Sequence, residues 1–180
     1  MKSLTAYEFK YADKQNLEAV LPGLFDILYS NMSIIAPTGN TYENDLKLWL
    51  SNMTPAMQKE SRQIVLMFAE DELAGYFQYY IRFDSLMMEE IQIRKDYQCT
   101  GLFHLFYSWL VKKLPQNIKY AEACSHKNNY KSQGILEHLG LIRQGENKNG
   151  NSFYYKGDYS VLLQKYSQPN MRGVKSLDTK

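Results

Sequence analysis

The spacing of apolar residues predicts a strand and then two helices in the first third of the chain. Alternation over residues 5–11 favours a short strand, because successive strand side chains point to opposite faces. From 17 to 28 the apolar positions recur every three or four residues, which is the period of one helical face. Pro22 predicts either a kink there or two short helices. The loop 36–40 ends this segment, and residues 42–53 form a second predicted helix.

The middle of the chain changes to strand patterns. Residues 63–69 are an apolar run of strand length, and 73–83 return after a tight polar turn, which is typical of a hairpin. A third strand is predicted over 86–94. A polar connection then leads into 102–113, where the apolar positions have a strong helical period that ends near Pro115.

The last third of the chain predicts a strand, a helix and a closing hairpin. Residues 117–124 are the strand, and the helix over 130–139 follows a pair of asparagines that are good caps. The strands 141–146 and 152–164 flank the turn signal 147–151, which is rich in Asn and Gly. This order of elements indicates a mixed α/β domain with a largely antiparallel sheet in its front half.

Composition and charge indicate a single globular domain. The chain has 180 residues, of which 44% are hydrophobic and 22% charged, and its formal net charge is +2. Residues 1–166 are predicted to form the domain, and 167–180 a polar, mobile tail. Lysines and arginines are dispersed rather than gathered in a basic stripe, so nucleic acid is not expected as a partner.

The sequence predicts neither a membrane segment nor a metal site. The opening residues 1–10 lack the apolar core of a signal peptide, and no stretch approaches the roughly 18 apolar residues of a membrane span. A cytoplasmic location is the resulting expectation. Cys99 and Cys124 are too few for a disulfide framework, and their spacing is not that of a zinc site.

The stretch 89–109 carries the most chemical information, because it passes from a strand through a short loop into a helix. The first N–H groups of a helix lack internal acceptors and, together with the helix dipole, attract an anion. Gly101 leaves room for a phosphate to approach the main chain. Arg94 and Lys95 are placed to add positive charge at the rim. The junction therefore suits a pyrophosphate.

Two motifs resemble those of the GCN5-related N-acetyltransferase (GNAT) superfamily, within residues 63–164. The family's strand-loop-helix carries Gln or Arg, two variable residues, Gly, one variable residue, and then Gly or Ala. Gln98 and Gly101 match this pattern, whereas Phe103 does not. The later stretch 129–141 is similar to a family helix that begins with Asn and ends in an aliphatic-Gly-aromatic turn.

In this second motif Asn129, Leu139 and Gly140 match, and Leu141 replaces the usual aromatic residue. The resemblance implies a GNAT-like single domain with a bent, mostly antiparallel sheet that splays open between its fourth and fifth strands, flanked by helices. It also implies an acyltransferase that binds acetyl-coenzyme A as co-substrate in that gap, without a metal.

The resemblance further implies which residues hold the co-substrate. Its pantetheine arm would add like a strand to the open edge at Ile91, Gln92 and Ile93. Asn129 would approach the pantetheine or its thiol end. The pyrophosphate would lie on amides of the loop and first helical turn, which are those of Gln98, Cys99, Thr100, Gly101, Leu102 and Phe103.

Transfer to an amine needs a base, because an ammonium has no lone pair for attack. Glu89 and Glu90 lie in the strand before the loop, and alternation aims them at opposite faces, so only one is expected to enter the cleft. Polyamine acetyltransferases of the family have a similar acidic pair, which narrowly favours Glu89 as the base. The alternative for each is an ordinary solvent-facing carboxylate, and His126 is a further candidate base.

The proton donor for the departing thiolate stays open. Many relatives use a Tyr at the position of Leu136, and here Tyr130 or water is the candidate replacement. Cys124 has no activating partner in the sequence and is expected to be a buried small residue. The aromatic residues that either line the acceptor pocket or pack in the core are Trp49, Tyr79 and Phe83.

The expected function is N-acetyl transfer from acetyl-coenzyme A to a primary amine of a small molecule, by direct attack in a ternary complex. One alternative is a non-catalytic acyl-coenzyme A-binding sensor of the same fold, which Phe103 and Leu136 favour. Another is an unrelated α/β interaction protein whose motif matches are accidental. The acceptor and the acyl length stay open, and a homodimer is possible because many relatives pair.

Overall fold

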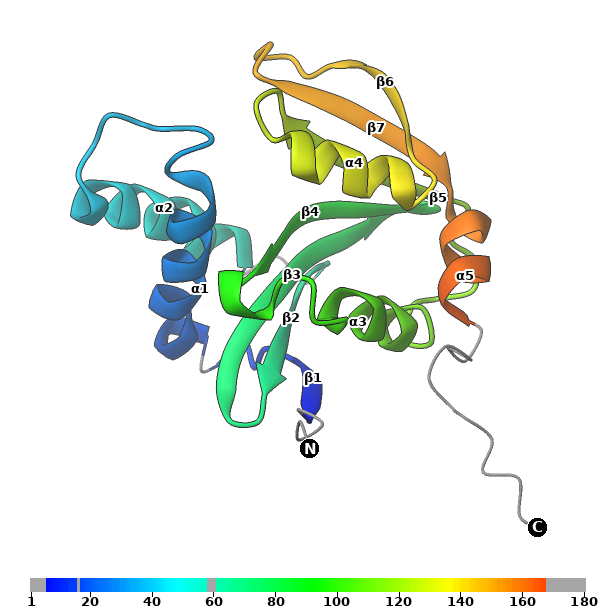
Figure 1. Cartoon of the computed structure of the whole chain (residues 1–180), viewed down its shortest axis with the longest axis horizontal. Helices are drawn as coiled ribbons and strands as arrows, with labels where there is room; N and C mark the ends of the chain where they lie inside the picture. The colour runs from blue at the N-terminus through cyan, green and yellow to red at the C-terminus, as the bar shows by residue number, and fades with distance from the viewer. Residues whose placement is uncertain (1–5, 16, 58–60, 168–180) are drawn as a thin grey trace.

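The computed structural model describes residues 6–15, 17–57 and 61–167 (Figure 1). The predicted tail lies outside these residues, except for Ser167 at the end of the last helix. In chain order, the elements are β1 (Tyr7–Tyr11), α1 (Leu17–Met32), α2 (Tyr42–Met57), β2 (Arg62–Ala69), β3 (Glu72–Arg82), β4 (Ser85–Ile93), the 3₁₀ turn η1 (Lys95–Tyr97), α3 (Leu102–Leu110), β5 (Tyr120–His126), α4 (Tyr130–His138), β6 (Ile142–Glu146), β7 (Ser152–Asp158) and α5 (Tyr159–Ser167).

The strands form one seven-stranded sheet in the order β1-β2-β3-β4-β5-β7-β6. Every neighbouring pair is antiparallel except β4 and β5, which run parallel. Consecutive hairpins build β2, β3 and β4, as their apolar runs and polar turns predicted. The predicted mixed α/β fold with a mostly antiparallel sheet is confirmed.

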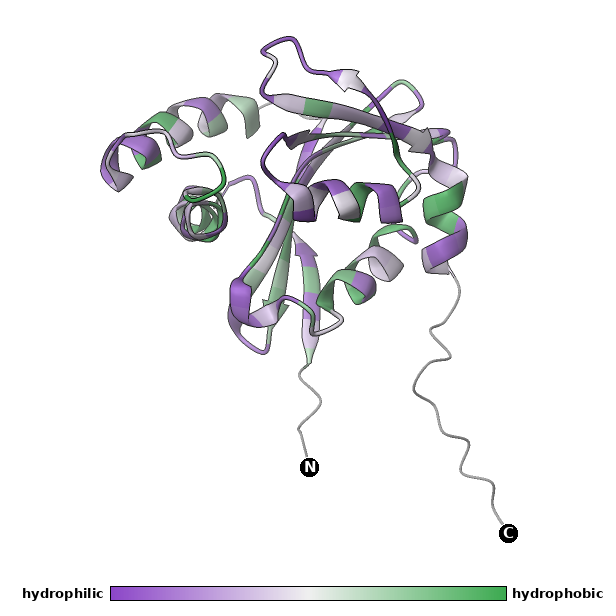
Figure 2. Ribbon diagram, turned by 45° about the horizontal axis from the view of Figure 1, so that its top comes forward, coloured by the Kyte–Doolittle hydropathy of each residue, from purple (hydrophilic) through white to green (hydrophobic). Residues whose placement is uncertain are grey.

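Two apolar cores cover opposite faces of the sheet, and Figure 2 shows α1 with α2 on one side of the central strands and α3 with α5 on the other. Alternation along β2 divides its side chains between the two cores: Val65 and Met67 face α3, whereas Ile64 and Leu66 face α1. None of the helices in the described ranges is long and apolar enough to cross a bilayer.

Helix α1 is continuous through Pro22, where the sequence predicted a kink or two helices. Pro22 lies in the second turn, so the missing N–H removes one bond, to the carbonyl of Glu18, and the helix continues beyond it. Leu17, Leu21 and Leu24 bury one face of the helix against the sheet. The gain from this packing outweighs the local loss.

The single strand predicted over 152–164 is wrong beyond Asp158, where α5 begins. The buried residues of this second half are Tyr159, Leu162 and Tyr166, which are spaced by three and four and lie on one helical face. The period of the pattern changes within the segment, and the sequence interpretation extended the first period too far.

Candidate active site

The sheet opens between β4 and β5. Their parallel pairing joins Ser85–Met88 to Tyr120–Ala123 and ends there. Beyond this point β4 follows β3 as far as Ile93, and β5 follows β7 as far as His126, so the two strands separate. The predicted splay between the fourth and fifth strands is confirmed.

A cavity of about 620 Å³ fills the opening. Its lining comes from β3, β4 and β5, from the loop before α3, from α3 and α4, and from the end of α1. The lining includes most of the residues that the sequence assigned to binding or catalysis: Glu89, Glu90, Ile91, Gln92, Ile93, Gln98, Cys99, Phe103 and Asn129. A second cavity of about 770 Å³, between the end of α3 and the start of α5, contains none of them.

The end of β4 presents free main-chain groups to this cavity. The N–H of Arg94 donates to the carbonyl of Ala74 on β3, at 2.9 Å. Because N–H and C=O groups alternate sides along a strand, those of Ile93 and Ile91 point away from β3 and into the opening. Gln92 lies between them and directs its main chain towards β3.

Amide side chains cap one of these main-chain groups. The carbonyl of Ile93 accepts hydrogen bonds from Asn31 Nδ2 at 3.0 Å and from Gln98 Nε2 at 2.8 Å. Asn31 also donates to Gln92 Oε1 at 3.0 Å, and Lys131 Nζ donates to Gln98 Oε1 at 2.5 Å. A chain of polar contacts thus joins α1, the end of β4, the loop and α4 across the opening.

The loop turns into α3 at Gly101, which has a φ of 90°. This left-handed conformation favours glycine, and a Cβ built there would meet no atom within 4 Å. The first helical N–H to find an acceptor is that of Leu105, which donates to Gly101 O at 3.1 Å. The N–H groups of the preceding residues lie at the exposed N-terminus of the helix, where an anion is favoured.

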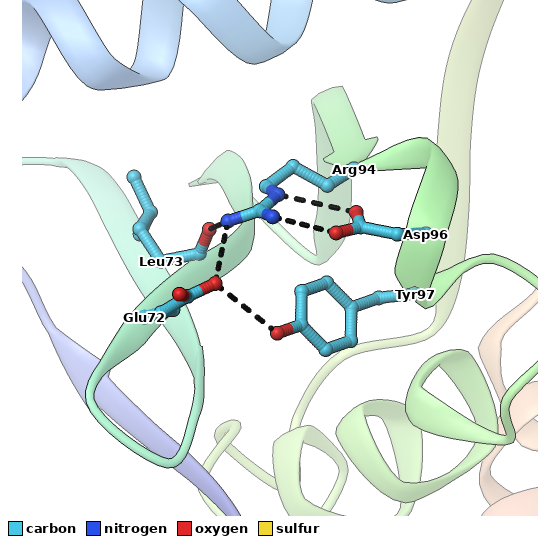
Figure 3. Close-up of polar contacts among 5 residues, drawn as sticks. All are labelled: Glu72, Leu73, Arg94, Asp96 and Tyr97. Carbon is cyan, nitrogen blue, oxygen red and sulfur yellow. Dashed lines mark hydrogen bonds and ion pairs between the residues drawn. The ribbon is translucent and has the colours of Figure 1, made fainter.

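Arg94 holds the loop in place through contacts with neighbouring carboxylates (Figure 3). Its guanidinium donates to Asp96 from Nε at 3.1 Å and from Nη2 at 2.5 Å, and also to Glu72 from Nη1 at 3.1 Å. The hydrogen bond with Asp96 raises the pKa of Arg94 and lowers that of Asp96. Of the two residues expected to add positive charge at the rim, Lys95 lines the cavity, whereas Arg94 does not and is paired with two carboxylates.

Phe103, which departs from the family pattern, lines the cavity without covering the helix start. Its ring lies 4.7 Å from that of Tyr107, with the planes tilted by 47°. The phenol of Tyr107 is buried and its hydroxyl contacts Met88 Sδ at 3.7 Å. Phe103 thus belongs to an aromatic wall of the cavity, and the space beside Gly101 stays open.

A β-bulge in β4 brings two carboxylates to one face of the sheet. Gln78 on β3 pairs with Glu90, and the next residue, Tyr79, pairs with Met88, so Glu89 is the extra residue. A bulge interrupts the strict alternation of side chains. The prediction that Glu89 and Glu90 point to opposite faces is therefore wrong, and both line the cavity from the α1 side.

Glu89 is held in a bidentate ion pair. Arg62 on β2 donates from Nε to Glu89 Oε2 at 2.5 Å and from Nη2 to the other oxygen. Gln78 Nε2 donates to Oε2 at 2.9 Å. The Arg62 guanidinium also lies over the ring of Tyr80, 5.6 Å from its centroid. The Glu89 side chain, 25% exposed, is thus tied to a fixed cation.

Glu90 has no positively charged side chain within ion-pair distance among the described residues. Gln92 Nε2 donates to its Oε1 at 3.2 Å. The buried hydroxyl of Tyr76 lies near Glu90 but does not meet the geometry of a hydrogen bond to it. Burial raises the pKa of Glu90, and the Gln92 amide and the Tyr76 hydroxyl only partly oppose this rise. A carboxylate with a raised pKa in a cavity is a candidate general base, so the structure favours Glu90 where the sequence favoured Glu89.

The start of α4 contributes a cap and an apolar wall. Asn129 is the N-cap, and its Oδ1 accepts from the N–H of Ser132 at 3.0 Å, while Nδ2 faces Met32 Sδ at 3.6 Å. Leu136, at the position of the family's Tyr, is buried against the cavity. Tyr130 is 77% exposed and does not line the cavity, so the structure does not bring this candidate proton donor to the cleft.

The end of β5 adds a thiol and an imidazole to the cavity. Cys124 was predicted to be buried, but the residue is exposed. Partial desolvation of its thiol raises the thiol pKa, which opposes a nucleophilic role. His126 Nδ1 accepts from the N–H of Asn128 at 3.2 Å, which leaves the proton of the neutral ring on Nε2. The nitrogen that could accept a proton is thus already engaged by the main chain. The described residues contain no cluster of His, Cys, Asp and Glu that could hold a metal.

The end of α1 supplies a cavity wall that the sequence interpretation missed. Leu28, Asn31 and Met32 from the helix, with Ile35 from the following turn, all line the cavity. These residues are spaced by three, one and three, so they form a second stripe along the helix. The helical pattern predicted from the sequence ended at residue 28 and therefore left most of this stripe out. The aromatic residues proposed for this role lie elsewhere, and none of Trp49, Tyr79 and Phe83 lines the cavity.

Searches with protein-family models and among curated proteins found no match. Several solved structures match the fold of this chain over nearly their whole length. An acetyltransferase from Thermus thermophilus has a TM-score of 0.68 at 16% identity, covering 88% of this chain and 99% of that one. The PaiA N-acetyltransferase of Thermoplasma acidophilum, in complex with coenzyme A, has a TM-score of 0.64 at 14% identity, covering 86% and 99%.

A third structure carries the family name. It is described as an acetyltransferase of the GNAT family from Desulfovibrio desulfuricans, and it matches with a TM-score of 0.62 at 15% identity, over 85% of this chain and 99% of that one. Identities this low establish the fold alone. The chain therefore has the GNAT fold, and the resemblance seen in its two sequence motifs is confirmed at the level of the fold.

Proposed function

We propose that this protein transfers an acetyl group from acetyl-coenzyme A to the primary amine of a small molecule. One observation carries the proposal: the free edge of β4, the half-buried carboxylate of Glu90, and Gln98, Cys99 and Phe103 on either side of the start of α3 all line the cavity where the sheet opens. The N-acetyltransferase with coenzyme A among the solved structures of this fold supports the choice of co-substrate.

The free main chain accounts for binding of the co-substrate. The pyrophosphate would accept hydrogen bonds from amides within 98–103, where the turn at Gly101 leaves space. The pantetheine amides would pair with Ile91 and Ile93 as an added strand. For this pairing the side chains of Asn31 and Gln98 must release the Ile93 carbonyl that they cap. Asn129 would face the thiol end from the opposite wall.

Glu90 would act as the general base. The substrate ammonium gives one proton to the Glu90 carboxylate, and the amine lone pair attacks the thioester carbonyl carbon. The new C–N bond forms and leaves a positively charged nitrogen, which loses its surplus proton as the C–S bond breaks. That proton reaches the departing thiolate through water, so coenzyme A leaves as the thiol, and Glu90 later returns its own proton to solvent. A base with a raised pKa suits this task, because its conjugate acid is closer in strength to the ammonium.

Hydrogen-bond donors near the thioester complete the proposed chemistry. The N–H of Ile91 points into the opening and would stabilise the oxyanion of the tetrahedral intermediate. The leaving thiol has an ordinary pKa of about 8.5, so water suffices to protonate the thiolate at neutral pH. The substitution of Leu136 for the family's Tyr is compatible with this route.

Release of free thiol from acetyl-coenzyme A, measured over a panel of small primary amines, tests the proposal. Glu90→Gln is expected to lower kcat about 100-fold or more, with unchanged affinity for coenzyme A. Glu89→Gln is expected to lose less, because Glu89 is neutralised by Arg62. For the wild type, kcat/KM should rise with pH through the pKa of Glu90, since the base must be ionised.

The sensor hypothesis predicts a different result. Tight binding of coenzyme A by calorimetry, without thiol release for any amine in the panel, would support the sensor and contradict the transferase. A failure to bind coenzyme A at any concentration would contradict both.

A further inference from the structure

The two carboxylates of the cavity differ in how many hydrogen-bond partners they already have. Glu89 receives two N–H groups from Arg62 and one from Gln78, so both of its oxygens are occupied. Arg62 is only 18% exposed and is further fixed by the ring of Tyr80. The Arg62 charge balances that of Glu89 and repels a ligand ammonium there. For the ammonium to replace Arg62 as the partner of Glu89, the bidentate pair must break and leave the Arg62 charge unpaired, which is costly in a partly buried site.

Glu90 is available to a ligand cation. Within the described part of the chain its hydrogen bond comes from the neutral amide of Gln92, and no Lys, Arg or His lies within ion-pair distance of it. Of the described residues that line the cavity, Glu89 and Glu90 are the acidic ones, and the lysines Lys95 and Lys131 line it as well. The cavity therefore offers one carboxylate for one ammonium.

The wall beside the two carboxylates is apolar. Leu28, Met32 and Ile35 contribute hydrocarbon and thioether groups from α1 and the turn after it. Asn31, the polar member of this stripe, is engaged with Gln92 and with the Ile93 carbonyl. A hydrocarbon chain attached to the amine would replace water on this wall, which is favourable, whereas a second ammonium would lose its hydration there without an acidic partner.

We infer that the acceptor is a primary monoamine with an apolar body, and that Arg62 excludes polyamines by neutralising Glu89. This inference rests on the proposed transferase function and specifies its substrate. Arg62 acts through Glu89 and is a positioning residue for specificity. Without the Arg62 guanidinium, both Glu89 and Glu90 should be able to pair with ligand ammonium groups.

A matched pair of amines isolates the second charge. Pentylamine and 1,5-diaminopentane differ only in the second amine group, so their ratio of kcat/KM, from thiol release at pH 7.5, reports on that charge alone. The wild-type enzyme is expected to prefer pentylamine by about 100-fold, a size typical of stranding a charge in a partly buried site. A ratio of one, or a preference for the diamine, overturns the inference and leaves the transferase function intact.

Variants of Arg62 test the cause of the preference. Arg62→Met removes the charge and keeps an unbranched chain, and it is expected to reduce the preference for pentylamine about tenfold. Arg62→Lys keeps the charge but loses the bidentate pair, so it should reduce the preference by less than Arg62→Met does. The ratio is measured within each variant and does not depend on how much protein is folded. An unchanged ratio in Arg62→Met overturns the role of Arg62, and the wild-type ratio still decides the substrate class if that variant does not fold.

The two proposals fail in distinguishable ways. If neither of these amines nor any other primary amine yields free thiol while coenzyme A binds, the transferase function is refuted and the inference falls with it. Thiol release with 1,5-diaminopentane at least as fast as with pentylamine refutes the inference alone.

Discussion

The paired and the open parts of the β4–β5 junction each hold a glutamate, fully buried in the paired part and half-buried in the open part, and the two have opposite electrostatic surroundings. In the paired part, Glu122 on β5 is 3% exposed and accepts from the Tyr154 hydroxyl at 2.7 Å and from Lys156 Nζ at 3.1 Å. Arg82 adds a second cation at 3.5 Å. Burial alone would raise the pKa of Glu122, but the hydrogen bonds from Tyr154 and Lys156 outweigh it and lower the pKa.

In the open part, Glu90 has no such cations, and burial raises its pKa. The same type of side chain, on neighbouring strands of one sheet, thus has a lowered pKa in one place and a raised pKa in the other. The difference shows that burial of a carboxylate does not by itself indicate a functional group: the charge of its neighbours decides.

The largest effect is expected in the open part, from Gly101→Val. The valine would require the left-handed φ of 90° and would place methyl groups over the amides at the start of α3. We expect the Kd for coenzyme A, measured by calorimetry, to rise about 100-fold. Gly39→Val is the matched control, because Gly39 also has a positive φ of 78° and open space within 4 Å of where a Cβ would lie, but belongs to the loop between α1 and α2 and not to the start of α3. An equal loss of affinity in both variants would mean that backbone strain alone is responsible.

In the paired part, Glu122→Gln should affect stability and leave catalysis alone. The variant loses the charge that Lys156 and Arg82 share, so the free energy of unfolding at pH 7 should fall by about 2 kcal/mol. The effect should fade as pH falls towards 4, because a group with a lowered folded-state pKa stabilises only while it is ionised. Denaturation at both pH values, with kcat measured per folded molecule, checks both statements. A drop in kcat would place Glu122 in the reaction after all.

A smaller and opposite effect is expected from Glu90→Gln in thermal unfolding. A group whose folded-state pKa is raised costs stability once pH rises through that pKa, so the neutral variant should melt at a higher temperature than wild type at pH 8. The gap should close at pH 4, where the wild-type carboxyl is protonated in both states. A lower melting temperature at pH 8 would show that ionised Glu90 is stabilised by its neighbours.

The smallest effect should come from Asn129→Ala at the start of α4. It removes the side-chain acceptor of the Ser132 N–H and should cost about 1 kcal/mol, or roughly 3 °C in Tm. Asn128→Ala is the control, because Asn128 donates its side-chain amide to Ile35 O at 3.4 Å and does not cap the helix. Similar losses in both variants would argue against a specific capping role.

The local periods of the sequence predicted most of the fold. The change from strand to helix around Gly101 was readable because a polar loop separates two different spacings of apolar residues. The hairpins of β2, β3 and β4 were readable for a similar reason. Where one apolar stretch changes period without an intervening loop, as at Tyr159, the same method failed.

The site was only partly predictable, because long-range pairings shape it. The bulge at Glu89 follows from the register between β4 and β3, which no local spacing reveals. The ion pair that ties up Glu89 comes from Arg62, 27 positions earlier in the chain. Arg94 had the charge expected of an anion site, but its carboxylate partners include Glu72 on another strand. The sequence located the cleft correctly and misjudged which charges in it are free.

The capped carbonyl of Ile93 has a consequence for the protein while its cleft is empty. An unpaired strand edge inside a sheet is a template on which a strand from another molecule can polymerise. The side chains of Asn31 and Gln98 occupy the Ile93 carbonyl, and a side chain, unlike a strand, cannot extend the sheet. The side-chain amides of Asn31 and Gln98, which would release the Ile93 carbonyl when pantetheine binds, thus also oppose self-association at this edge.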